Sequence, residues 1–107
     1  NDLSKLKKDL LSVAVSEEET VESIRSLYKK YNYLACPHSA LAAYALKKQM
    51  QKTDKKVTGI FLCTAHPVKF SELYKTILPN ENLFEKINLS EIKLPKQPIE
   101  IEKDFSL

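Results

Sequence analysis

The clearest pattern in the chain is a helical repeat of apolar residues between positions 17 and 31. The apolar positions recur at the spacing of one helix face and are Val21, Ile24, Leu27, Tyr28 and Tyr31. Ser16 is followed three residues later by Glu19, which is the sequence signature of a capping box. Lys29 and Lys30 place favourable charge in the last turn. The pattern therefore predicts a helix over 17–31.

Three other segments also favour helix. Residues 2–11 set leucines on one face and lysines on the other. The alanine-rich stretch 39–51 follows Pro37, a residue that suits the first turn of a helix because its missing N–H costs little there. Residues 67–78 begin with a proline and carry apolar residues at helical spacing. We expect a helix in each of these segments.

Two segments favour strand instead. Residues 57–63 form a continuous β-branched and apolar run, which fits a buried parallel strand, and 12–15 is a shorter stretch of the same kind. Two strands cannot make a stable open sheet alone. The prediction is therefore an α/β fold in which a few strands flanked by helices complete a larger parallel sheet. Residues 1–79 would form this α/β segment, and 80–107 would be a C-terminal tail that packs on the body.

Composition narrows the possible functions. The 107 residues include one glycine, so a glycine-rich phosphate loop would have to lie outside them. The net charge is +3, and lysines are interspersed with glutamates, which indicates a solvated surface rather than a nucleic-acid interface. No apolar run is long enough to span a membrane, so a cytoplasmic location is expected. The chain does not open with Met, which suggests a cut, processed or excerpted sequence.

The two cysteines, Cys36 and Cys63, lie in apolar stretches and are predicted to be small buried thiols. They are not spaced as a CxxC zinc motif, and nothing in the sequence supports a disulfide between them. The two histidines lack partners at a recognised metal-ligand spacing. We therefore expect no metal site.

Polar residues follow the apolar run 57–63 directly, which is the usual layout of a ligand site in an open α/β sheet. Thr64 either contacts a ligand through its hydroxyl or caps the helix that begins at position 67. His66 either binds an anion or relays a proton, or else fills a loop. Lys69 either attracts an anion or is solvated, and His38 either orients a ligand or is structural. The residues alone leave these alternatives open.

Three motifs stand in order along the chain. They are Val15-Ser-Glu-Glu-Glu-Thr20, Pro37-His-Ser-Ala40 and Thr64-Ala-His-Pro-Val-Lys-Phe70. They resemble motifs that the threonine synthase family carries in the same order, and the last two resemble its Pro-His-Thr/Ser-Ala and Thr-Ala-His-Pro-Ala-Lys-Phe motifs. The resemblance covers roughly residues 10–80 and is to the carboxyl-terminal part of the family.

The resemblance implies a fold-type II pyridoxal-phosphate enzyme, a lyase that converts O-phosphohomoserine and water into threonine and phosphate. It places Thr64 where a hydroxyl contacts the pyridine nitrogen of the cofactor. It places His66, Lys69 and His38 in the shell of the active site, around a small phosphorylated amino acid. The Schiff-base lysine and the phosphate loop would lie upstream, in the N-terminal remainder of the same protein. The segment would then hold no catalytic residue and would be inactive alone.

One departure from the family pattern leaves the reaction open. Many members carry Asp before Pro-His, where this chain has Cys36. A Cys-Pro-His-Ser pattern also resembles threonine synthase-like phospho-lyases, which eliminate phosphate from phosphorylated amino acids. A third alternative is a non-catalytic module that binds a protein partner.

Overall fold

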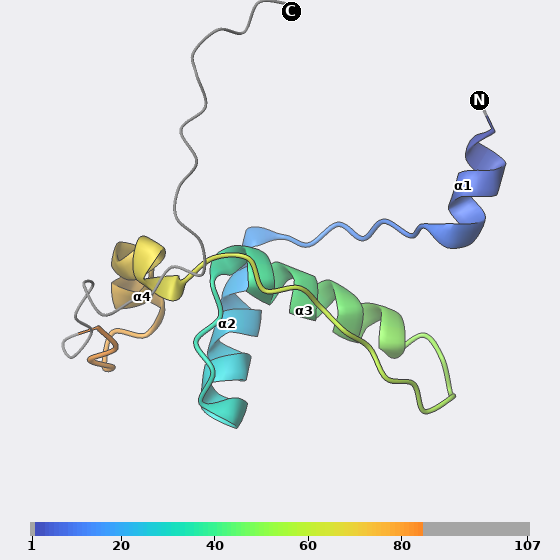
Figure 1. The fold of residues 1–107 in the computed structure, drawn as a ribbon. Helices are drawn as coiled ribbons and strands as arrows, with labels where there is room; N and C mark the ends of the chain where they lie inside the picture. The colour runs from blue at the N-terminus through green and yellow to red at the C-terminus, as the bar shows by residue number, and fades with distance from the viewer. Residues whose placement is uncertain (1, 85–107) are drawn as a thin grey trace, which may run out of the picture.

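The structure, a computed structural model, describes residues 2–84. Figure 1 shows their path through space. The elements in chain order are α1 (Leu3–Asp9), α2 (Glu17–Tyr31), α3 (Pro37–Met50), the 3₁₀ helix η1 (Pro67–Phe70) and α4 (Ser71–Ile77). The helices expected near residues 2–11, 17–31 and 39–51 are confirmed.

Helix α2 begins and ends where its sequence predicts. The Ser16 hydroxyl accepts a hydrogen bond from the Glu19 amide, and the Glu19 carboxylate accepts one from the Ser16 amide, which completes the capping box. The helix ends at Asn32, which adopts a left-handed conformation with φ 52°. Asparagine tolerates this conformation better than most residues, so the chain can turn here towards α3.

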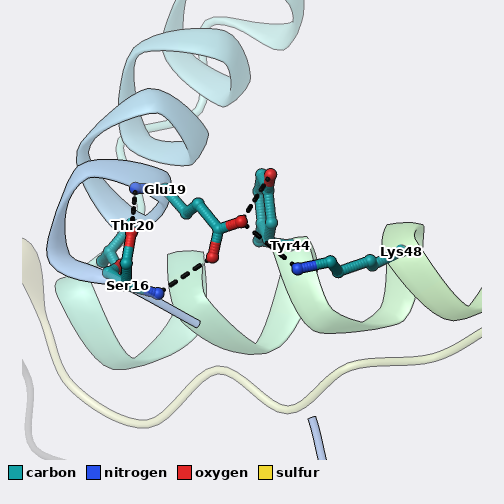
Figure 2. A network of polar contacts seen from close by, with 5 residues as sticks. All are labelled: Ser16, Glu19, Thr20, Tyr44 and Lys48. Atoms are coloured by element: carbon teal, nitrogen blue, oxygen red, sulfur yellow. Dashed lines mark hydrogen bonds and ion pairs between the residues drawn. The ribbon is translucent and has the colours of Figure 1, made fainter. Parts of the chain in front are cut away.

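The Glu19 carboxylate also connects α2 to α3, as Figure 2 shows. One of its oxygens accepts hydrogen bonds from the Tyr44 hydroxyl and from Lys48 Nζ, each at 3.2 Å. The pKa of Glu19 is lowered, first by the hydrogen bond from the Ser16 amide and then by that from Lys48. The residue that caps α2 therefore also fixes its crossing with α3.

A small apolar core forms where α2, α3 and α4 meet. Its buried members are Ile24, Ala35, Ala40, Tyr74 and Ile77. Two buried hydroxyls are paired with backbone carbonyls inside it, because an unpaired polar group would be costly there. Ser23 donates to the Ala40 carbonyl at 2.8 Å, and Tyr74 donates to the Ala35 carbonyl at 2.7 Å. The small alanine side chain at position 40 suits this close approach of the helices.

The predicted α/β architecture is wrong for the described residues. Between residues 2 and 84 no strand and no sheet is formed, and both 12–15 and 57–63 lie outside any regular element. The second segment runs along α3 (Figure 1), where Gly59 packs against the Leu46 side chain. A β-branched run favours an extended backbone, but a strand also needs a neighbouring backbone for its ladder of hydrogen bonds. This segment packs on a helix, which offers no such ladder.

Two parts of the chain keep their apolar side chains exposed. Helix α1 has no buried residue, and it is set apart from the other helices in Figure 1. Ile60 and Leu62 in the extended segment are 87% and 77% exposed. None of the described helices is long and apolar enough to cross a membrane.

The helix predicted over 67–78 is present in two pieces, because the tighter turn η1 precedes α4. The sequence also suggests a turn or two of helix over 82–87, and none begins by residue 84, the last described residue. Most of the predicted tail, 85–107, lies outside the described residues.

Candidate functional site

Two of the predicted site residues lie together on the wall of an open hollow of about 700 Å³. Thr64 and His66 line it, with an aromatic and apolar wall from Tyr28, Tyr33 and Leu34 and a polar edge that includes Glu81. Lys69 and His38 are both exposed but do not line this hollow. The structure therefore brings together only part of the set that the sequence singled out.

Thr64 is held in place by the first turn of α3. Its amide donates to the Ser39 hydroxyl at 3.2 Å, and its hydroxyl oxygen lies 3.7 Å from Cys36 Sγ. The alternative in which Thr64 caps the following helix is wrong. The cap of η1 is His66, whose Nδ1 accepts from the Val68 amide at 3.2 Å. The Thr64 hydroxyl is thus not used as a cap.

His66 therefore has a structural contact as well as a place in the hollow. Since Nδ1 accepts a hydrogen bond, only its other ring nitrogen is available to a ligand. His38 makes an edge contact with the Phe70 ring, at 5.9 Å between centroids. This contact ties the first turn of α3 to η1, so the motifs at 37–40 and 64–70 touch one another.

Cys36 is the N-cap of α3 and is 1% exposed. Its sulfur accepts from the Ser39 amide at 3.4 Å and lies 3.0 Å from the Ser39 hydroxyl. Burial by itself raises the pKa of the thiol. Hydrogen bonds from the Ser39 hydroxyl and amide, the Ala65 amide and the Thr64 hydroxyl outweigh burial and lower the pKa of Cys36 to about 6.

Cys63 differs from the prediction. It is exposed and lies on the wall of the hollow, where its sulfur is 3.1 Å from the Tyr33 hydroxyl. Both cysteines are free thiols. Along residues 2–84 no group of three or more His, Cys, Asp or Glu side chains gathers in a way that would hold a metal ion.

Sequence reasoning missed the pairing of Cys36 and Ser39 with Thr64. The contact between Cys36 and Ser39 had a sequence signal. Cys36 stands directly before Pro37, at the N-cap position, and Ser39 is the third helical residue. No sequence signal links either of them to Thr64, which is 25 residues beyond Ser39.

The described residues fit the ring nitrogen of a pyridoxal-phosphate cofactor and do not fit its phosphate group. A hydroxyl at the wall of an open hollow suits a neutral contact with a ring nitrogen. The only glycine, Gly59, lies with its Cα face against Leu46, where an added Cβ would meet Leu46 Cδ1 at 2.6 Å. The glycine serves packing, so the described residues offer no glycine cradle for a phosphate. They form an open hollow with a hydroxyl and an imidazole on its wall.

The chain is similar to threonine synthases from several organisms. It is 38% identical to that of Haemophilus influenzae over 102 residues, which cover 92% of this chain and 22% of the relative. It is 39% identical to that of Serratia marcescens over 88 residues, covering 82% of this chain and 20% of the relative. With that of Escherichia coli the identity is 41% over 71 residues, 66% of this chain and 16% of the relative.

The chain therefore belongs to the threonine synthase family and corresponds to its C-terminal part. It spans about a fifth of the length of these relatives. No protein-family model matches the chain. No solved structure matches it either.

Proposed function

We propose that this chain is the part of a threonine synthase that contacts the ring of pyridoxal phosphate. The native-length enzyme would convert O-phosphohomoserine and water into threonine and phosphate. The names of the relatives, the three motifs and the position of Thr64 on the hollow support the proposal. The predicted cytoplasmic location belongs to this proposal as well.

One observation carries the proposal on the structural side. The Thr64 hydroxyl lies on the wall of the hollow and is held there by two buried residues, Cys36 and Ser39. When bound, pyridoxal phosphate supplies an electron sink, and the protein orients and tunes it. The contribution of this chain is to place Thr64 Oγ1 next to the ring nitrogen. A neutral hydroxyl does not force protonation of that nitrogen as a carboxylate would.

The three other predicted residues belong to the proposal as a shell. His66 is two residues from Thr64, lines the same hollow and has one ring nitrogen free of the cap. Lys69 is an exposed cation one turn further along, and it would attract the phosphate of the substrate. His38 touches Phe70 and would hold η1 in position beside α3. The Schiff-base lysine and the phosphate cradle would come from the remainder of the same protein, so the segment alone would be inactive.

The names of the relatives favour replacement by water over elimination of phosphate, and they favour an enzyme over a protein-binding module. The products decide between the reactions. The native-length protein, loaded with pyridoxal phosphate, should release threonine and phosphate from O-phosphohomoserine. Release of 2-oxobutyrate in place of threonine would contradict the proposal.

The role of Thr64 is tested with Thr64→Val, a change that keeps the shape and removes the hydroxyl. Loss of one hydrogen bond of about 1.4 kcal/mol in the rate-limiting step lowers kcat roughly tenfold. We also expect a changed absorbance spectrum of the bound cofactor. The matched control is Thr58→Val, since Thr58 is an exposed threonine of the same extended segment outside the hollow. Equal activity and equal spectra in the two variants would remove Thr64 from the site.

A further inference from the structure

The first turn of α3 contains two buried polar side chains that have no role of their own in the function proposed above. Cys36 and Ser39 are each 1% exposed. Both are one hydrogen bond away from Thr64, the residue proposed to meet the cofactor. Buried polar groups are usually retained with all their hydrogen bonds made, so the direction of each bond can be worked out.

The Ser39 hydroxyl has one proton and already accepts from the Thr64 amide at 3.2 Å. Its nearest other partner is Cys36 Sγ at 3.0 Å. With a charged sulfur at this position, which can only accept, the proton of Ser39 points at the sulfur. In this arrangement Ser39 fixes the backbone of Thr64 on one side and supplies a donor to Cys36 on the other.

The sulfur of Cys36 faces donors. Burial raises the pKa of the thiol, but hydrogen bonds to its charged form from the Ser39 hydroxyl and amide, the Ala65 amide and the Thr64 hydroxyl outweigh burial and lower the pKa to about 6. Two phenols stand close enough to feel its charge. Tyr33, from the connector before α3, has a raised pKa, first through its contact with Cys63. Burial in α4 raises the pKa of Tyr74 to about 12.

We propose that Cys36 and Ser39 are positioning residues for Thr64, and that the charge on Cys36 sets the direction of the Thr64 hydroxyl. A thiolate can only accept, so the Thr64 proton points at the sulfur and the oxygen offers a lone pair to the hollow. A neutral thiol can donate its own proton to Thr64, and the hydroxyl proton is then free to point into the hollow. The inference rests on the proposed function only where it names the ring nitrogen as the second partner.

The two states present opposite polarity to a ligand. An accepting Thr64 favours a protonated ring nitrogen, and a donating Thr64 favours an unprotonated one. A thiol with a lowered pKa changes charge within the working range of pH. Cys36 would therefore make the cofactor environment respond to pH.

The first test does not need the cofactor. The charge of Cys36 is followed by magnetic resonance in the native-length protein with isotope-labelled cysteine β-carbons, and the resonance is identified by its loss in Cys36→Ser. Thr64→Val should raise the pKa of Cys36 by about one unit, since a hydrogen bond to a charged group is removed. Thr58→Val should leave it unchanged. An unchanged pKa of Cys36 in Thr64→Val would overturn the proposal.

The second test follows the absorbance of bound pyridoxal phosphate against pH. The wild-type spectrum should change along the titration of Cys36. Cys36→Ser keeps a cap acceptor but does not titrate, so it should bind the cofactor with a spectrum independent of pH over that range. A wild-type spectrum that does not follow Cys36 would overturn the assigned direction of the hydroxyl. A protein that binds no pyridoxal phosphate would instead contradict the proposed function, and the thiol titration would still decide the positioning role.

Discussion

Helices α2 and α3 begin with the same geometry and different chemistry. In each, the N-cap side chain accepts a hydrogen bond from the amide three residues later, at 3.2 Å for Ser16 and 3.4 Å for Cys36. The α2 end is solvent-facing and completed by a carboxylate that reaches Lys48. The α3 end is buried and completed by a hydroxyl and a thiol that reach Thr64. The comparison indicates that one cap stabilises the fold, whereas the other also holds a site residue.

The largest expected effect concerns pH at the α3 end. The pKa of Cys36 is lowered from its ordinary value of 9.0 to about 6, so its contribution to stability is complete above about pH 9 and is lost as pH falls through about 6. Relative to Cys36→Ser, the free energy of unfolding of the wild type should rise across this range by up to about 4 kcal/mol. Denaturant titrations of the native-length protein at several pH values measure it.

The matched control for this prediction is Cys63→Ser, because Cys63 is an exposed free thiol. Its stability curve should run parallel to that of the wild type. A Cys36→Ser curve that is also parallel would mean that the α3 cap does not carry the thiolate, and the two helix ends would then differ only in burial.

The next effect is Ser39→Ala. The change leaves the Thr64 amide without its acceptor and removes a donor from the Cys36 sulfur, which should cost about 1–3 kcal/mol. Hydrogen exchange of the Thr64 amide should accelerate by the corresponding factor. Ser26→Ala, at an exposed position of α2, is the control and should leave that amide protected. Unchanged protection of Thr64 in Ser39→Ala would contradict the link between α3 and the site.

Removal of the α2 cap by Ser16→Ala should cost about 1 kcal/mol, because the Glu19 amide loses its acceptor. Exchange should accelerate in the first turn of α2 and not at Thr64. If Thr64 loosened equally, the separation between a structural cap and a site-holding cap would be wrong.

The smallest effect is expected for Lys48→Met. The ion pair with Glu19 is partly exposed, with 44% of the Lys48 side chain and 28% of the Glu19 side chain accessible. Such pairs contribute about 0.2–1 kcal/mol and are weakened by salt. The melting temperature of the variant should therefore lie below that of the wild type at low salt, and the difference should shrink at high salt. A loss larger than that of Ser16→Ala would show that the pair matters more than the cap.

Much of the local structure was predictable. The capping box and the apolar repeat predicted α2 to the residue, and Pro37 predicted the start of α3. Thr64 and His66 were singled out by their place after an apolar run, each with a structural alternative, and the family resemblance assigned them to a site. Both line the hollow, and their contact with a ligand stays a prediction. The sheet was predicted wrongly, since residues 57–63 have strand-like composition but lie along α3 without a ladder partner. The cap of η1 was assigned to Thr64 as one alternative, whereas His66 makes it.

The sequence by itself determined the helices, because periodicity and capping involve residues within a few positions of one another. It also determined the family, because three short motifs stand in order along the chain. Only the tertiary structure decided which partner each polar group has. Cys36 and Thr64 lie 28 positions apart and meet only because the chain between them runs out along α3 and back. Such contacts depend on how elements pack, and no local pattern encodes them.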